Sequence, residues 1–305
     1  GNLKKCVELK LGYLQIMWQA VNRLLSECLG PAEIRERTEL SGGDIHKAWR
    51  LSYGEKEVFV KCDTREMLSI FTAESDQLSL LARSKTVQVP EVYGVGSDRD
   101  YSFLLLEYIP LKPLDAHNAY CLGQQLAHLH QWSEQLQFGL DFDNDLATTP
   151  QPNSWQRRWA QFFAEQRIGW QLQLAAEKGM SFGDIDDITG AVQEHLQNHQ
   201  PQPSLLHGDL WPANCAASSN GPVIFDPACY WGDRECDLSM LPLYPTLPAQ
   251  IYDGYQSIWP LPIGFIERQP IYQLYYLLNR SNLFGGKHWI NAQKAVDNLL
   301  HPEQF

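Results

Sequence analysis

The chain has 305 residues, with 24 lysines and arginines against 36 aspartates and glutamates, so its formal net charge is −12. Its 44% hydrophobic and 20% charged residues are typical of a globular protein and argue against intrinsic disorder. The acidic charge and the lack of a basic stripe argue against a nucleic-acid partner, and no apolar run approaches the roughly 18 residues of a membrane-spanning helix.

The first hundred residues are predicted to form strands and one helix. Alternating apolar and polar residues and short apolar runs predict strands over residues 37–40, 46–51, 57–61, 92–96 and 103–107. Between residues 64 and 83 the apolar side chains recur at helical spacing instead. The proline-containing segment 109–113 then predicts a hinge, because proline fixes the backbone and removes a hydrogen-bond donor.

The chain beyond this hinge is predicted to be mainly helical. Asp115 is a suitable N-cap for the first of these helices. Further helical stretches are predicted over residues 155–170, 184–199 and 249–300, and two short strands near 204–206 and 223–225 flank a polar loop. The pattern favours a two-lobed α+β protein, with a small β-rich N-lobe over residues 1–109 and a larger, mainly helical C-lobe over residues 110–305.

The strongest functional signal is the run His-Gly-Asp-Leu-Trp-Pro-Ala-Asn over residues 207–214, followed by Val-Ile-Phe-Asp-Pro over residues 223–227. Phosphoryl transfer needs a carboxylate that orients or deprotonates the attacking hydroxyl, and oxygen ligands for Mg²⁺ at the phosphates. Asp209 would be the base, and Asn214 and Asp226 the metal ligands. Any one of them alone could be an ordinary turn or strand-end residue, but their order and spacing favour a kinase.

A second group of residues has the chemistry of a phosphate contact. Lys61 ends an apolar strand run and Glu74 lies on the helix that follows, so this carboxylate could orient the lysine toward nucleotide phosphates. The turn that contains Gly42 and Gly43 would cover those phosphates, although a Gly-Gly pair is also an ordinary hairpin turn. On their own, Lys61 and Glu74 would be interpreted as two solvated side chains.

The order of these motifs resembles the protein-kinase-like superfamily, in its small-molecule branch of aminoglycoside and choline kinases. His-Gly-Asp-x-x-x-x-Asn and Phe-Asp-Pro stand where protein kinases have His-Arg-Asp and Asp-Phe-Gly. Within that branch the chain is similar to the fructosamine kinase (ketosamine-3-kinase) family. The matching runs are Phe-Asp-Pro-Ala-Cys-Tyr-Trp-Gly-Asp-Arg-Glu-Cys-Asp-Leu at 225–238 and Leu-Leu-Asn-Arg-Ser-Asn-Leu-Phe-Gly at 277–285, with shorter matches at 59–61, 89–92 and 106–108. The resemblance spans nearly the whole chain and implies a protein-kinase-like fold.

The resemblance also implies an activity: ATP-dependent phosphorylation of the 3-hydroxyl of a ketosamine, which is a sugar joined to an amine by glycation. The unstable product releases the amine, so the reaction amounts to deglycation. Fructosamines, ribulosamines and erythrulosamines are the implied acceptors, as small molecules or on a glycated protein, and ATP and Mg²⁺ are the implied cofactors. The resemblance assigns Asp209 as the base and Asn214 and Asp226 as metal ligands. The implied nucleotide-binding residues are Lys61, Glu74, Gly42, Gly43, Glu107, Tyr108 and Ile109.

Four residues near the catalytic motif are candidates for acceptor binding: Trp211, Asp233, Arg234 and Glu235. Trp211 could stack on the apolar face of a sugar or on a charged amine, or it could be a buried residue that braces the loop. The other three could bind an amine or hydroxyls, or they could form a salt-bridged loop. Asp237 is expected to bond to the backbone of the catalytic loop rather than to the acceptor.

Three positions depart from the family's pattern. The family often has glycine or serine where this chain has Ala213 and histidine where it has Arg280, and some members carry a cysteine in the glycine-rich turn where this chain has Asp44. None of the three is the predicted base or a predicted metal ligand. Arg280 and Asp44 leave the acceptor preference and any redox control open.

Two other functions stay open from the sequence. A kinase of the same fold could act on an aminoglycoside, on choline or ethanolamine, or on a free sugar, because a fold does not determine its acceptor pocket. A pseudokinase would bind nucleotide without turnover. The presence of Lys61, Asp209, Asn214 and Asp226 argues against the pseudokinase, since a scaffold has no need to keep all four.

The cysteines and histidines suggest no metal centre. The seven cysteines are scattered and include no Cys-x-x-Cys, which predicts reduced thiols in a cytoplasmic protein and argues against zinc. No apolar segment of a secretory signal follows Lys4 and Lys5. His195 and His199 stand four residues apart, as metal ligands on a helix do, but no third ligand is in view, and a solvated helix face is the simpler interpretation.

Overall fold

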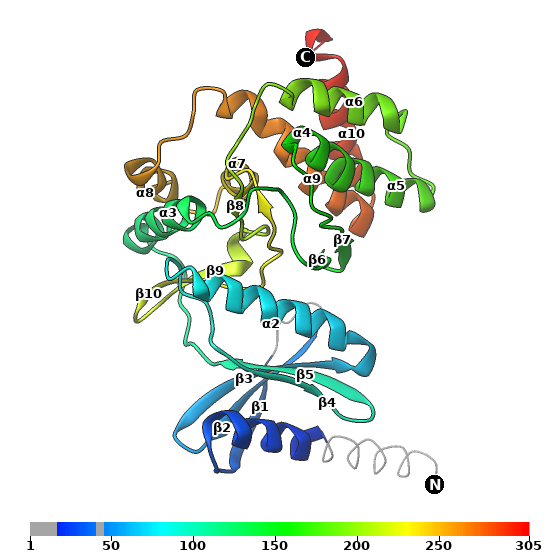
Figure 1. Cartoon of the computed structure of the whole chain (residues 1–305). Coiled ribbons are helices and arrows are strands. Elements are labelled where there is room, and N and C mark those ends of the chain that lie inside the picture. The colour runs from blue at the N-terminus through cyan, green and yellow to red at the C-terminus, as the bar shows by residue number, and fades with distance from the viewer. Residues whose placement is uncertain (1–16, 41–45, 305) are drawn as a thin grey trace. The chain divides into compact units, whose positions relative to one another are not determined.

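The computed structural model describes residues 17–40 and 46–304 (Figure 1). The chain forms two compact units, of which the first comprises Gly1–Arg83 and Val89–Leu111 and the second comprises Ser84–Gln88 and Lys112–Phe305. The predicted turn that holds Gly42, Gly43 and Asp44 lies outside the described residues. Within the described ranges, no helix is both long and apolar enough to cross a lipid bilayer.

A five-stranded antiparallel sheet forms the centre of the first unit, in the order β1-β2-β3-β5-β4. Its strands are β1 (Ile34–Leu40), β2 (Lys47–Tyr53), β3 (Lys56–Thr64), β4 (Val92–Ser97) and β5 (Tyr101–Glu107). A helix over residues 17–29 packs on one face of the sheet. The helix α2 (Leu68–Arg83) follows a short 3₁₀ turn, η1 (Arg65–Met67), and packs against β4 and β5.

The helix over residues 17–29 corrects the expectation of a single helix in this part of the chain. Met17, Val21 and Leu25 are fully buried, and their spacing of four places them on one face of a helix. They pack against Val58 and Val60 of β3. This spacing is visible in the sequence, so the same periodicity argument that identified the second helix could have found the first.

The alternation of side chains along β3 positions the candidate phosphate contact. Val58, Val60 and Cys62 are buried in the core against the helix over residues 17–29. Because successive side chains of a strand point to opposite faces, Lys61 lies on the other face. The helix α2 places Glu74 there, beside the lysine.

The second unit is mainly helical, as expected. Its helices are α3 (Ala116–Gln131), α4 (Trp159–Phe163), the π-helical turn η2 (Ala164–Gly169), α5 (Trp170–Glu177), α6 (Ile185–Leu196), α7 (Glu235–Met240), α8 (Gln250–Ile258), α9 (Phe265–Phe284) and α10 (Lys287–Leu300), with 3₁₀ turns η3 (Pro212–Asn214), η4 (Leu241–Leu243) and η5 (Pro302–Gln304). The predicted N-cap of α3 is confirmed, since the Asp115 carboxylate accepts a hydrogen bond from Asn118 N–H at 2.8 Å. The predicted helical tail from residue 249 onward is confirmed as α8, α9 and α10.

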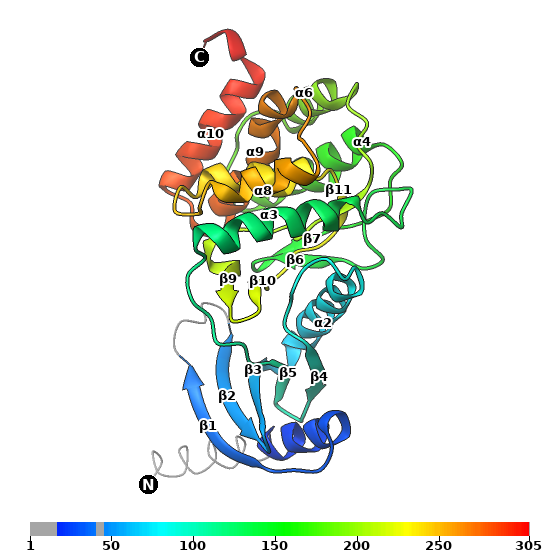
Figure 2. The ribbon, with the colours of Figure 1, turned by 90° about the vertical axis from the view of Figure 1, so that its left-hand side faces the viewer.

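Three small antiparallel pairs of strands complete the second unit. They are β6 (Asn144–Leu146) with β7 (Thr149–Gln151), β8 (Ser204–Leu205) with β11 (Trp231–Gly232), and β9 (Cys215–Ser218) with β10 (Gly221–Ile224). The predicted polar loop, which holds residues 207–214, runs between β8 and β9. In both views, the β6–β7 and β9–β10 hairpins lie at the same end of this unit (Figures 1 and 2).

Candidate active site

The loop over residues 207–214 is held from behind by one buried carboxylate. Asp237, on α7, accepts hydrogen bonds from the backbone N–H of His207 and of Gly208, each at 2.9 Å. The same carboxylate lies 2.8 Å from Nε2 of His130, and both of these side chains are fully buried. The expected bond from Asp237 to the backbone of the loop over residues 207–214 is therefore confirmed.

The protonation of this buried group follows from its partners. Burial alone would raise the pKa of Asp237, but the hydrogen bond and charge of His130, followed by His207 and the Gly208 amide, lower it overall. Burial lowers the pKa of His207, which therefore stays neutral. Its Nε2 donates to the Phe225 carbonyl at 2.7 Å, and its Nδ1 accepts the backbone N–H of Asp209 at 3.1 Å. His207 thus links the loop that carries Asp209 to the strand end that precedes Asp226.

The structure brings Asp209, Asn214 and Asp226 together. The Asn214 amide nitrogen donates to the backbone carbonyl of Asp209 at 2.9 Å and to its carboxylate at 3.2 Å, and it lies 3.4 Å from the Asp226 carbonyl. Asp226 has the left-handed φ of +49°, which is uncommon for a residue other than glycine. Backbone strain of this kind is often found at functional sites.

The electrostatics of this group fit a divalent cation. Burial, and next the charge of Asp226, raise the pKa of Asp209 to about 7. The two carboxylates therefore lie close enough for the charge of Asp226 to disfavour the ionised form of Asp209. Because the Asn214 amide nitrogen is used by Asp209, its carbonyl oxygen is the atom left for a cation, and Asp226 is exposed. An amide oxygen and a carboxylate are hard ligands of the kind that Mg²⁺ prefers.

The candidate phosphate contact lies within the first unit. Nζ of Lys61 donates to the Glu74 carboxylate at 2.6 Å, and each side chain is 14% exposed. A lysine and a glutamate that are this close and this shielded from water are not the two solvated side chains of the simpler interpretation. The pairing holds the lysine on the face of the sheet that carries α2.

The segment Glu107–Ile109, predicted to meet the adenine, begins at the last residue of β5 and continues beyond the strand. Tyr108 N–H donates to the Glu57 carbonyl on β3 at 3.3 Å, whereas Glu107 N–H donates to the Glu91 carbonyl at 2.8 Å. Along a strand, successive backbone groups point to opposite sides. The hydrogen-bonding groups of Glu107 are therefore directed away from β3, at the edge where the chain leaves the sheet.

Trp211 is half-buried and packs against an aromatic neighbour that the sequence did not reveal. Its ring centroid lies 5.8 Å from that of Tyr244, and the guanidinium carbon of Arg280 lies 4.5 Å from the Tyr244 centroid. Arg280 also acts on Asp209, since its charge partly offsets the rise in the pKa of that carboxyl. Tyr244 carries no motif signal, because its place beside Trp211 depends on how the chain folds back after α7.

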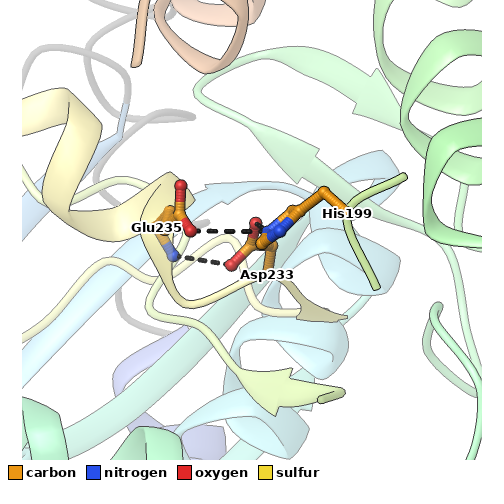
Figure 3. A group of neighbouring side chains, drawn as sticks. All are labelled: His199, Asp233 and Glu235. Atoms are coloured by element: carbon orange, nitrogen blue, oxygen red, sulfur yellow. Dashed lines mark hydrogen bonds and ion pairs between the residues drawn. The ribbon is translucent and has the colours of Figure 1, made fainter. Parts of the chain in front are cut away.

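Asp233 and Glu235 belong to a buried network rather than to an open surface (Figure 3). Asp233 accepts from the Tyr272 hydroxyl at 2.5 Å and from Nε2 of His199 at 2.8 Å. Glu235 forms two hydrogen bonds with Arg268, at 2.8 and 2.9 Å. Each of the two carboxylate side chains is only 1% exposed. The geometry favours the salt-bridged loop over direct binding of the acceptor.

Arg234 lies between these two residues in the sequence and is also largely buried. Its guanidinium donates to the carbonyls of Trp259 and Pro260 at 2.9 and 2.8 Å and lies 3.7 Å from the centroid of the Trp259 ring. These contacts join the start of α7 to the end of α8. They favour a structural role for Arg234 as well.

The interpretation of His199 as a solvated helix residue is wrong. It lies beyond the end of α6, and its ring approaches both Asp233 and Glu235, the latter at 3.4 Å (Figure 3). Three such ligand atoms within 4.8 Å of one another could in principle hold a metal ion. However, Arg268 and Tyr272 already donate to the same carboxylates, so the group is better described as a network of hydrogen bonds and ion pairs.

This network gives a prediction for stability. Arg268→Met should lower the free energy of unfolding by about 3 kcal/mol, because it leaves the Glu235 carboxylate buried without its cation. Urea denaturation of the variant and the wild type measures the difference. The control is Arg157→Met at an exposed position, where a change within about 0.5 kcal/mol is expected. Equal losses of unfolding free energy in Arg268→Met and Arg157→Met would contradict a stabilising role for the ion pair between Arg268 and Glu235.

Comparisons with known proteins agree with these features. The family model described as "Fructosamine kinase" matches residues 17–302. A protein of Klebsiella aerogenes named "Probable ketoamine kinase" is 72% identical over 285 residues, which cover 93% of this chain and 100% of the relative.

Solved structures show the same fold. A crystal structure from Haemophilus somnus is 41% identical and aligns with a TM-score of 0.90, covering 95% of this chain and 99% of that one. A mutant of the aminoglycoside phosphotransferase APH(4)-Ia, in a ternary complex with AMP-PNP and hygromycin B, aligns with a TM-score of 0.58 at 14% identity, covering 92% and 97%. The latter likeness shows the protein-kinase-like fold alone. By the family match and the identity to these relatives, the chain belongs to the fructosamine kinase family.

Proposed function

We propose that this protein is an ATP-dependent kinase that phosphorylates the 3-hydroxyl of a ketosamine. The observation that carries the proposal is the grouping of Asp209, Asn214 and Asp226 in a chain that belongs to the fructosamine kinase family. The name of the Klebsiella relative, "Probable ketoamine kinase", supports the acceptor class.

Asp209 is the general base of the proposed reaction. The acceptor hydroxyl oxygen attacks the γ-phosphorus of ATP, the bond from that phosphorus to the bridging oxygen of ADP breaks, and the hydroxyl proton passes to the Asp209 carboxylate. The hydrogen bond from Asn214 and the backbone link to His207 hold this carboxylate in place. Because both come from the same loop, the base is oriented before the acceptor binds.

The nucleotide is proposed to bind through the first unit. Lys61, oriented by Glu74, would contact phosphate, the turn at Gly42 and Gly43 would cover it, and the backbone of 107–109 would meet the adenine. The AMP-PNP complex of the aminoglycoside phosphotransferase, which shares the fold, supports ATP as the donor. Asn214 and Asp226 are proposed to hold Mg²⁺, which supplies positive charge at the phosphates when bound.

The proposed lobes differ from the two compact units at residues 84–88, which group with the second unit, and at residues 110–111, which group with the first. The N-terminal lobe, about residues 1–109, would bind the nucleotide, and the C-terminal lobe, about residues 110–305, would carry the base, the metal ligands and the acceptor. A small-molecule ketosamine or a glycated protein is the proposed acceptor, and the cytoplasm is the proposed compartment. The two alternatives are a kinase of the same fold that acts on an aminoglycoside, on choline or ethanolamine, or on a free sugar, and a nucleotide-binding pseudokinase.

A coupled assay of ADP release with Mg-ATP tests the proposal. The acceptors are ribulose-lysine and fructose-lysine adducts, compared with free ribose, choline and kanamycin. Turnover on an adduct but not on its parent sugar, and its loss when EDTA removes the divalent cation, are the expected results. Turnover only on choline or kanamycin would mean that the acceptor is one of these compounds and not a ketosamine. ATP binding without turnover on any compound would favour the pseudokinase.

A further inference from the structure

Arg280 lies on the face of α9 that is turned toward the catalytic loop. Tyr276, four residues earlier on the same helix, donates its hydroxyl to the Gly208 carbonyl at 3.0 Å. Residues four apart lie one above the other on a helix, so Arg280 occupies the next position along this face. The electrostatic coupling between Arg280 and Asp209 agrees with that placement.

The guanidinium of Arg280 is half-buried and lies on the ring of Tyr244, which in turn contacts Trp211. Within residues 17–40 and 46–304, this guanidinium forms no hydrogen bond and no ion pair, although the charge of Asp209 acts on it. Its five N–H donors are therefore not used by other side chains of the described residues. Burial is the largest influence on Arg280 and lowers its pKa.

A second cation acts on the same region, although the chain as a whole carries a net charge of −12. Burial, followed by the charges of Lys287 and Arg280, lowers the pKa of His288 at the start of α10, so His288 is neutral. Its ring contacts Phe284, which follows Arg280 by one turn of α9. The surroundings of Arg280 are therefore aromatic rather than acidic, with Tyr244 on its guanidinium.

We propose that Arg280 binds a carboxylate of the acceptor, so that the preferred substrate is the ketosamine of an amino acid whose carboxylate lies close to the glycated nitrogen. The inference rests on the proposed ketosamine kinase activity. A planar guanidinium matches a carboxylate with two parallel hydrogen bonds. A glycated amine without a carboxylate would bring only its own positive charge to Arg280 and would be repelled. In an α-amino acid adduct, the carboxylate pairs with Arg280, and the rings of Tyr244 and Trp211 lie next to this pair.

The test compares two acceptors that differ only in the group that Arg280 would contact: fructosylglycine and fructosylglycinamide. The wild type should favour the carboxylate adduct in kcat/KM by about tenfold to a hundredfold, the range of one charge-assisted hydrogen-bonded pair. Arg280→Gln should remove this preference, so that the kcat/KM values of the variant for the two adducts agree within about threefold. Arg280→Lys should retain part of it. Calorimetric Kd values for both adducts give a second readout that does not need turnover.

Lys287→Gln is the matched control, since it removes a neighbouring exposed charge and leaves Arg280 in place. Lys287→Gln should retain the preference for the carboxylate adduct, because that preference comes from direct contact with Arg280 and not from the overall positive potential of the region. Equal kcat/KM and Kd for the two adducts in the wild type would overturn the inference and leave the kinase activity standing. So would an equal loss of kcat for both adducts in Arg280→Gln, which would mean that Arg280 acts on the transferring phosphoryl group. Absence of turnover with a carboxylate preference in Kd that Arg280→Gln removes would support the inference and contradict the proposed function.

Discussion

Asp209→Asn is expected to lower kcat by about a hundredfold to ten-thousandfold, the range of a general base. The variant keeps the size of the side chain but cannot accept the hydroxyl proton. Nucleotide binding should stay within about twofold of the wild type, because the proposed direct contacts to the nucleotide lie in the first unit and Asp209 is not a proposed ligand of Mg²⁺. The ADP-release assay gives kcat, and calorimetry with Mg-AMP-PNP gives the Kd.

The matched control is Asp253→Asn, at an exposed position on α8, which should leave kcat unchanged. Wild-type turnover in Asp209→Asn would show that Asp209 is not the general base. A large loss of nucleotide affinity together with kcat would instead mean that Asp209 holds the nucleotide or its cation.

Gly208→Ala should cost about 3 kcal/mol of unfolding free energy and lower kcat by about a hundredfold. Gly208 has a φ of +87°, and a Cβ placed there would lie 1.9 Å from the Ala228 carbonyl oxygen and 2.6 Å from its carbon. Both contacts are with backbone, so the loop or the segment 226–230 must move. A shift of about 1 Å in a catalytic group can cost about a hundredfold in rate. Urea denaturation and the ADP-release assay measure the two effects.

Substitutions at two other glycines separate the cost of the strained backbone from the cost of the close contact with Ala228. Gly221→Ala introduces the same kind of strained backbone, with a φ of +109°, but has open space around its Cβ, so only about 1–2 kcal/mol is expected. Gly190→Ala lies inside α6, also in open space, and should stabilise by up to about 1 kcal/mol. If Gly208→Ala cost no more than Gly221→Ala and kept its kcat, the close approach to Ala228 would not matter.

The parts of the fold that could be predicted are those whose signal is local. The alternation along β3 and the capping aspartate of α3 each lie within a few residues of sequence, and the structure agrees with both. The helix over residues 17–29 has an equally local signal in Met17, Val21 and Leu25, so the sequence is sufficient to predict it as well.

The candidate site also has one part with a local sequence signal and one part without it. Asp209 and Asn214 are five residues apart, so their spacing alone indicates that they can meet in one loop. The surroundings of Asp233 and Glu235 depend on His199, Arg268 and Tyr272, which come from three separate segments. No spacing rule connects those segments, because only the folded chain brings them together. The choice between acceptor binding and a salt-bridged loop therefore needed the structure.

The short segment Ser84–Gln88 affects how this protein can be cut and recombined. It lies between two stretches of the first unit in sequence but packs with the second. There the Gln88 carbonyl accepts the Ile224 N–H at 3.0 Å, and its side chain accepts from the Ser218 hydroxyl at 3.4 Å. A fragment that begins at Lys112 would leave the β9–β10 hairpin without these partners. Chimeras that exchange acceptor specificity between relatives should therefore transfer residues 84–88 together with the C-terminal segment.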